Sequence, residues 1–149
     1  MSATNTSENN IMLLIFNNTN WANLGDATGV RGSTAAGSLY VTGHTAALGE
    51  ASTQTTSEAT YTGYARAAVA RSGAGWTVSG TAPTQAANAA SVSLGACTAG
   101  SNTLTDFGVG RDAAAAGELI FYGTLTASLA VSAGITPSFA TSALVVTVD

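Results

Sequence analysis

The residue types that most often perform chemistry are scarce in this chain. The sequence of 149 residues holds one histidine, His44, and one cysteine, Cys97. A catalytic histidine needs a nucleophile and an orienting carboxylate at fixed geometry, and no spacing around His44 singles out such partners. Cys97 has no cationic neighbour that would favour its thiolate, and a lone cysteine forms neither an internal disulfide nor a cysteine metal cluster. We therefore expect no enzymatic activity from either residue.

Acidic residues and glycine-rich stretches offer three further candidate sites, and each signal is weak. Asp106, Asp112 and Glu118 carry oxygen ligands for a cation, but their spacing matches no known calcium loop. The segment 25–32, GDATGVRG, is followed by no lysine that would hold a phosphate. The triplet 106–108, DFG, lacks the catalytic-loop and strand-lysine partners that accompany it in kinases. The sequence therefore predicts no catalytic residue, no metal site and no cofactor.

Charge is the most unusual property of the composition. Charged residues make up 8% of the chain, against about 25% in ordinary globular domains. All four basic residues are arginines, and the net charge is −4. A nucleic-acid surface needs clustered basic residues, so we expect no nucleic-acid partner. Because a free monomer normally relies on more surface charge than this, we expect neighbouring subunits to cover much of the surface, as in a dimer or trimer.

No segment of the sequence predicts export or membrane insertion. The N-terminal stretch MSATNTSENN lacks the basic region of a signal peptide. No apolar run approaches the length of about 18 residues that indicates a membrane helix. We expect synthesis in a cytoplasm and no membrane partner.

The pattern of apolar and polar residues predicts an all-β protein, a single-domain jelly roll or β-sandwich with a short N-terminal arm and helix. Turn signals recur at intervals of about 8–12 residues, which is typical of such folds. Residues 1–17 are expected to form the arm (1–6) and a helix (8–17) capped by Ser7. Residues 18–149 are expected to form one β-domain, which begins with a loop at 17–36.

The predicted strands occupy most of the chain after this loop. They are 38–44, 61–71, 76–79, 91–94, 103–109, 118–122, 124–132 and 143–148, and 81–90 is either a weak strand or a crossing loop. Leu104 and Phe107 are out of phase with strand alternation, which predicts a bulge. The connections 45–60 and 110–117 are expected to be functional or to form interfaces, because long loops in compact domains usually do.

The segment Tyr61–Gly80 is predicted to be the β-hairpin around which the fold is organised. Its two strands flank a glycine-containing turn at 72–75. Trp76 follows this turn, and a tryptophan buries about 150–250 Å² when it enters a core. The expected core residues are Trp21, Trp76, Phe107, Phe121 and Phe139.

Apolar residues of the predicted helix and three arginines are the expected contacts with other subunits. The helix carries its apolar residues as a stripe, and arginine is favoured where two subunits form a bidentate ion pair. These candidates are Ile11, Leu14, Ile15, Phe16, Arg66, Arg71 and Arg111.

Stretches along nearly the whole chain carry a family resemblance. They are 14–22 (LIFNNTNWA), 38–50 (SLYVTGHTAALGE), 56–80 (TSEATYTGYARAAVARSGAGWTVSG), 105–110 (TDFGVG) and 117–149. In these stretches the chain resembles a family of small structural proteins of tailed-bacteriophage virions, often described as tail-fibre-like. The family often has Asp-Pro where this chain has Ala47 and Leu48, so this loop is expected to differ in shape.

The resemblance implies a virion structural protein without enzymatic activity. Compact size and low charge favour a capsid decoration or cement protein that binds and stabilises the head shell. Its partners would be further copies of itself and other virion proteins, above all the major capsid protein, after assembly in the host cytoplasm. One alternative is a tail or tail-fibre-associated structural or adaptor module. Another is a glycan-binding β-domain in which Trp21, Tyr40, Tyr61 or Tyr64 stacks on a sugar.

Overall fold

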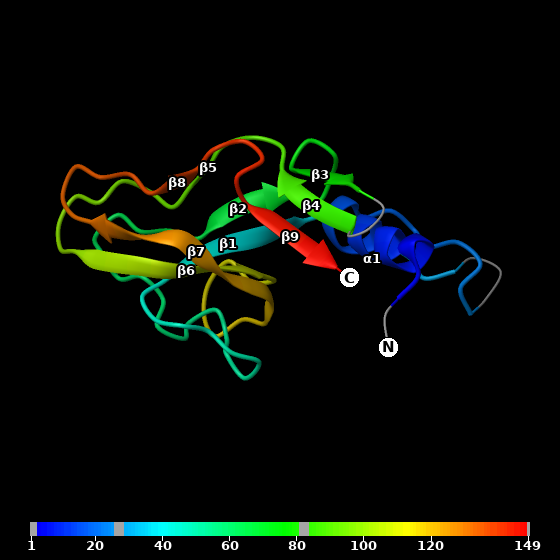
Figure 1. Ribbon diagram of the computed structural model, residues 1–149, viewed down its shortest axis with the longest axis horizontal. Helices are drawn as coiled ribbons and strands as arrows, with labels where there is room; N and C mark the ends of the chain where they lie inside the picture. Colours follow the sequence, from blue (N-terminus) through cyan, green and yellow to red (C-terminus); the bar gives the residue numbers. More distant parts are fainter. Residues whose placement is uncertain (1–2, 26–28, 81–83, 149) are drawn as a thin grey trace. The chain divides into compact units, whose positions relative to one another are not determined.

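The computed structural model describes residues 3–25, 29–80 and 84–148. Contacts within the chain divide it into two compact units. Unit 1 takes in Met1–Ser38, Ala70–Ser91 and Phe139–Asp149, and unit 2 takes in Leu39–Val69 and Val92–Ser138. The described fold is mostly β with a short N-terminal helix (Figure 1), so the predicted fold class is confirmed. Within these described ranges, no helix has the length and apolar composition needed to cross a membrane.

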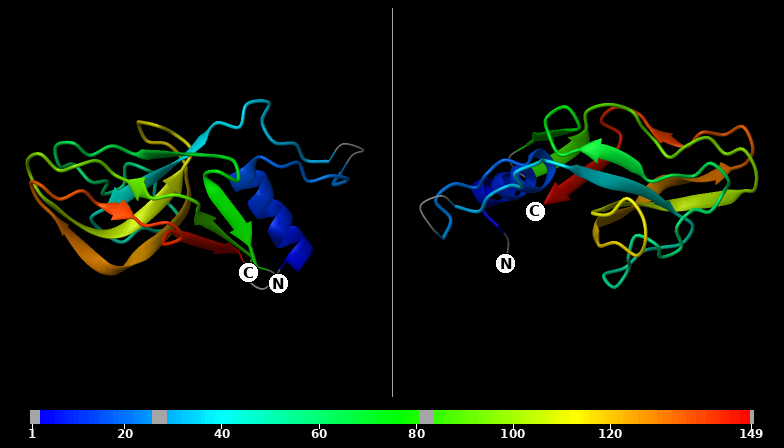
Figure 2. Two further views of the ribbon diagram at one scale, coloured as in Figure 1. Left: turned by 90° about the horizontal axis from the view of Figure 1, so that it is seen from above. Right: turned by 180° about the vertical axis from the view of Figure 1, so that it is seen from behind.

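Unit 1 pairs a helix with a three-stranded antiparallel sheet. The helix is α1 (Asn5–Asn17), and the strand order is β3 (Trp76–Ser79), β4 (Thr84–Asn88) and β9 (Val145–Val148). Figure 2 shows α1 beside this sheet, where it contacts β3 and β4. The buried residues of α1 are Glu8, Met12 and Phe16, and their spacing of four places them on one face of the helix.

The N-terminus of α1 differs from the prediction. Thr4 is the N-cap, and its side-chain oxygen accepts a hydrogen bond of 3.4 Å from the backbone N–H of Ser7. Ser7 was expected to be the cap, and instead it lies inside the first turn. The helix begins earlier because Thr4 has the extended backbone of an N-cap residue, so Asn5 and Thr6 are helical rather than part of an arm. Residues 1–2 of the expected arm lie outside the described residues.

Aromatic packing forms the core of unit 1. Trp76 is completely buried, and its ring centroid lies 4.8 Å from that of Phe16 in an edge-to-face arrangement. Such pairs stabilise a core beyond the area that they bury, by about 0.5–1.5 kcal/mol. At the same end of β3 and β4, where Asn88 lies opposite Trp76, the buried side chain of Asn88 donates to the carbonyl of Ala140 and accepts from the N–H of Leu144. The segment before β9 is thereby held to β4.

Unit 2 is built on a second antiparallel sheet. The strand order is β2 (Ala67–Ala70), β1 (Ser38–His44), β6 (Asn102–Gly110) and β7 (Leu119–Val131), and β5 (Val92–Ser93) pairs with β8 (Ser138–Phe139). β1 and β6 pair in regular register, with Val41 opposite Val109. The register of β6 with β7 shifts between Leu104 and Asp106, so the predicted bulge is confirmed.

Several predicted strands appear with altered bounds. Residues 38–44 and 76–79 are strands as predicted, and 143–148 shortens to β9. The predicted strands 118–122 and 124–132 are joined in the single strand β7, whose first residues are half-buried. The alternative of a weak strand at 81–90 holds for 84–88, while 81–83 and residues 26–28 of the expected loop lie outside the described residues.

The hairpin predicted over Tyr61–Gly80 is wrong. β2 lies in the sheet with β1, whereas β3 pairs with β4 in the other sheet. The turn at 72–75 exists, but its hydrogen bonds are local, with the N–H of Trp76 donating to the carbonyl of Ser72. A turn signal specifies a change of direction and not the partner of the next strand. The partner is decided here by burial of Trp76 against Phe16, which places β3 under α1.

The aromatic residues that the sequence assigns to the core differ in burial. Trp76 has no exposed surface, whereas Trp21, Phe107, Phe121 and Phe139 are half-buried. Trp21 forms an isolated antiparallel bridge with Val30, which closes the loop between α1 and β1.

We predict that Trp76→Ala lowers the free energy of unfolding by about 3–5 kcal/mol, because the substitution leaves a cavity beside Phe16. Urea denaturation measures the loss. Trp21→Ala is the matched control, because half-buried Trp21 belongs to a loop. An equal loss in both variants would show that the packing of Trp76 is not special.

Candidate functional site

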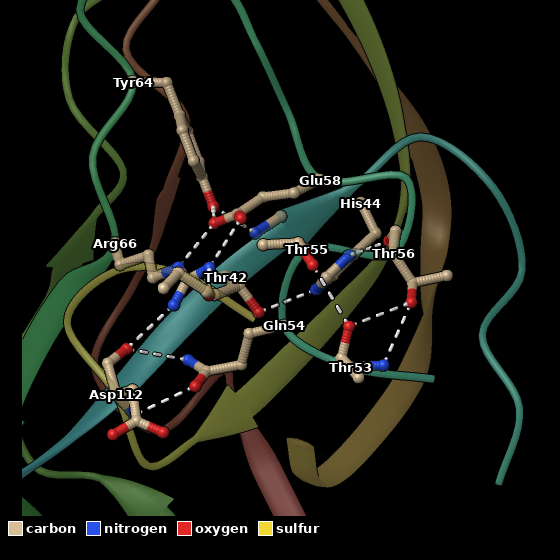
Figure 3. A network of polar contacts seen from close by, with 12 residues as sticks. Thr42, His44, Thr53, Gln54, Thr55, Thr56, Glu58, Tyr64, Arg66 and Asp112 are labelled. Carbon is tan, nitrogen blue, oxygen red and sulfur yellow. Dashed lines mark hydrogen bonds and ion pairs between the residues drawn. The ribbon is translucent and has the colours of Figure 1, made fainter. Parts of the chain in front are cut away.

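A buried ion pair between Arg66 and Glu58 lies in unit 2 (Figure 3). The guanidinium of Arg66 donates from Nε to Oε1 of Glu58 at 2.7 Å and from Nη2 to Oε2 at 2.8 Å. The two side chains are only 5% and 15% exposed. Tyr64 donates its hydroxyl to Oε1 of Glu58 at 2.8 Å. Both carboxylate oxygens are therefore matched by donors, as a buried charge requires.

The ion pair also holds the loop between β6 and β7. Arg66 donates from Nη1 to the carbonyl of Asp112 at 3.0 Å and from Nη2 to that of Ala115 at 2.7 Å. The hydrogen bond to Glu58 raises the pKa of Arg66. Burial, followed by the hydrogen bond to Glu58, raises the pKa of Tyr64, so its hydroxyl stays protonated and remains a donor. One arginine thus connects the loop that carries Glu58 with the loop at 111–118.

Gln54 makes a second connection between the same two loops. Its completely buried amide donates to the carbonyl of Asp112 at 3.1 Å and accepts from the N–H of Asp112 at 2.9 Å. Its backbone N–H donates to the carbonyl of Gly117. A β-carbon at Gly110 or Gly117 would overlap with the Gln54 side chain, so both positions need glycine for close approach.

His44 is sealed inside unit 2 and belongs to this polar network. Nδ1 lies 2.8 Å from the carbonyl of Thr56, and Nε2 lies 2.7 Å from the hydroxyl of Thr42. Since a carbonyl only accepts, Nδ1 carries the proton and Nε2 accepts from Thr42. Burial lowers the pKa of His44, although the Thr56 carbonyl and the charges of Glu58 and Asp106 act in the opposite direction. The imidazole is thus a neutral structural element.

The other candidates for chemistry are not brought together. Cys97 is buried and donates weakly to the carbonyl of Ala99. Asp106 is buried and accepts from the hydroxyl of Thr124, whereas Asp112 and Glu118 lie near Arg111. Among the residues that the structure describes, no group of three histidine, cysteine or acidic side chains is placed to hold a metal ion.

Arg71, a predicted interface residue, is used inside unit 1. It donates from Nε to the carbonyl of Ile15 and from Nη2 to that of Leu14, both at 2.7 Å. Its Nη1 donates at 3.2 Å to the carbonyl of Ala36 and to the hydroxyl of Ser33. A cation at the carbonyl end of α1 satisfies groups that the helix leaves without partners and suits its dipole.

The remaining interface candidates fall into three environments. Phe16 is buried against Trp76, and Ile11, Leu14 and Ile15 on the same helix are half-buried. Arg66 forms the buried ion pair with Glu58 in unit 2. Arg111 is exposed and forms ion pairs of 3.2 Å with Asp112 and Glu118. An exposed pair of this kind contributes about 0–1 kcal/mol.

The aromatic residues proposed for sugar stacking are partly used inside the protein. Tyr61 is buried, and its hydroxyl donates to the carbonyls of Leu94 and Gly95. Tyr64 donates to Glu58. Trp21 and Tyr40 are half-buried.

Sequence reasoning missed Glu58 and Gln54, although they bind the two long loops together. The sequence did hold one indication of Glu58. The chain has only eight acidic residues, so a buried arginine has few possible carboxylate partners. Glu58 lies eight positions before Arg66, which is not a spacing that regular structure brings into contact. These hydrogen bonds hold two loops in place. The tips of the loops are exposed at 46–47, 49–51 and 113–116.

Comparison with known families gives one result that spans nearly the whole chain. The family model described as "Podophage GP4 fiber I protein gp80" matches residues 2–147. No curated protein matches the chain.

We predict that Arg66→Met lowers the free energy of unfolding by about 3–5 kcal/mol, because it leaves the Glu58 carboxylate buried without its cation. Chemical denaturation of the full chain measures this loss. Arg111→Met is the matched control and should cost no more than about 1 kcal/mol, because its pairs are exposed. Equal stabilities of the two variants would contradict a central role for the buried pair.

We predict that stability falls as the pH drops below the ordinary histidine pKa of 6.5. The unfolded chain takes up a proton near this pH, whereas buried His44 has a lowered pKa and stays neutral, so protonation favours unfolding. Urea denaturation at a series of pH values between about 7.5 and about 5.5 measures the effect. His44→Gln should remove most of this dependence, since the chain has one histidine. An unchanged pH profile in that variant would overturn the assignment.

Proposed function

The chain belongs to the podophage GP4 fiber I protein family, and from this premise we propose that it is a non-enzymatic structural subunit of the virion's fibre apparatus. The match over residues 2–147 carries the proposal. Membership in this family makes the chain a structural protein of a bacteriophage virion. The family description names a fibre, which favours a fibre-associated position over the head shell that composition first favoured.

The geometry of the site supports a role in which the loops of unit 2 are held in one conformation for contact with another protein. Arg66 and Gln54 fix the loops of unit 2 through buried hydrogen bonds, and glycine at 110 and 117 allows the close approach. Preorganised loops lose little conformational entropy when they bind another protein, which benefits a permanent assembly. His44 and Glu58 serve this support, so their polar atoms already have partners inside the protein.

Head decoration is the second candidate, and low charge favours it. A protein that neighbours cover on several sides needs few of the charged residues that keep a free monomer soluble, and this chain has 8%. In that position the major capsid protein would be its partner. In either position we propose assembly in the host cytoplasm with further copies of the chain and with other virion proteins, and with no nucleic-acid or membrane partner.

Copy number and position in purified particles distinguish the two candidates. For a fibre subunit we predict few copies, in multiples that match the symmetry of the tail, and antibody label confined to the tail. Quantitative mass spectrometry against the major capsid protein measures the copy number, and immunogold electron microscopy measures the position. A ratio near one copy per capsid subunit, with label over the head, would replace the fibre assignment with head decoration. Absence from particles would overturn both.

A further inference from the structure

β7 is an edge strand that carries no charge. It is the last strand in the order β2, β1, β6 and β7, so one of its edges faces no strand in the part of the chain that the structure describes. The sequence from residue 119 to residue 148 contains no charged side chain. Natural edge strands are usually blunted by lysine or other charges, by proline or by bulges, because an open edge invites pairing with another chain. Of these features, β7 has only bulges.

The second half of β7 is exposed on both faces. Residues 119–125 alternate between half-buried and exposed, apart from half-buried Ile120, whereas 126–130 are exposed without interruption. Tyr122 and Leu129 are large apolar side chains with exposed fractions of 43% and 38%. A strand normally buries at least one face against a core, so this half obtains little burial from its own chain.

Bulges divide β7 and limit how it can pair. Phe121 to Thr124 pair regularly with Val109 to Asp106, and the register shifts on both sides of this segment. On one side, the four residues from Leu125 to Ser128 lie opposite Thr105 alone. Bulges bend a strand and interrupt its ladder, so an added strand can extend only a short way. This geometry suits a closed contact between few subunits better than an endless sheet.

We propose that residues 122–130 of β7, of which all but Gly123 and Leu125 are exposed, are the surface through which two copies of this chain associate. A partner with charged groups would have to bury them against a surface that offers no counter-charge, which is costly. A second copy brings an equally uncharged stretch, and a contact between identical surfaces is self-complementary about a two-fold axis. The unpaired backbone groups of one edge are met by those of the other.

β7 supplies one dimension of such a contact. Nine strand residues at about 3.3 Å each span at most about 30 Å, and the register shift at 125–128 shortens this length. A standard interface of about 800 Å² per partner is about 28 Å across, so residues beside β7 have to complete its width. This contact would be the self-association surface of the proposed virion subunit. Its existence is argued from the open, exposed and uncharged edge of β7, and only its biological role rests on the proposed function.

The test measures the mass of the purified full chain by analytical ultracentrifugation at increasing concentration. We expect a self-associating wild type. Leu129→Lys should weaken its association by at least about tenfold, because it places a positive charge at the contact on each copy. Thr126→Lys should do the same, and it removes no large apolar side chain from the strand. In the wild type, amide exchange in 122–130 should slow as the protein associates.

Leu24→Lys is the matched control, since it makes the same substitution at an exposed fraction of 44% in unit 1. Its association should equal that of the wild type. A wild type that stays monomeric, association unaffected by both β7 variants, or equal weakening by the control would each overturn the proposal. Because the assay uses isolated protein, its result is separable from the position of the protein in the particle. A protein found on the head would leave this contact intact.

Discussion

A buried charge must be matched at every polar atom, and the Arg66–Glu58 pair meets this constraint in unit 2. Its four hydrogen bonds from Arg66 use both carboxylate oxygens of Glu58 and two loop carbonyls. Since desolvation of each ion costs several kcal/mol, the pair is stable only while all of these contacts form together. The loop at 111–118 therefore has little freedom to move independently of Glu58.

Arg71 solves a similar problem in unit 1. It donates to carbonyls at the end of α1 and to the segment that leads into β1. Both arginines thus form their hydrogen bonds within the protein, where a planar cation with several donors can join segments distant in sequence. Few charges then remain for the surface, and the run from 119 to 148 has none.

A surface with few charges, held loops and an open edge strand are together suited to permanent assembly. Solubility as a free monomer normally calls for more surface charge, whereas a subunit covered by neighbours does not need it. Membership in this family is consistent with the low content of charged residues, since a structural protein of a virion is in contact with other subunits. The self-association surface proposed on β7 and the loops of unit 2 would then serve different neighbours.

The fold class, the N-terminal helix, strand 38–44, the bulge near Leu104 and the family are all predictable from the order of residues. These features follow from local periodicity and from motifs, which a linear chain carries in full. The assignment of β2 and β3 to different sheets, and the roles of Arg66 and Arg71 inside the protein, emerge only from three-dimensional packing. Strand partners and buried ion pairs join residues far apart in sequence, and their choice depends on which combination buries Trp76 and pairs Arg66 with Glu58 at the same time.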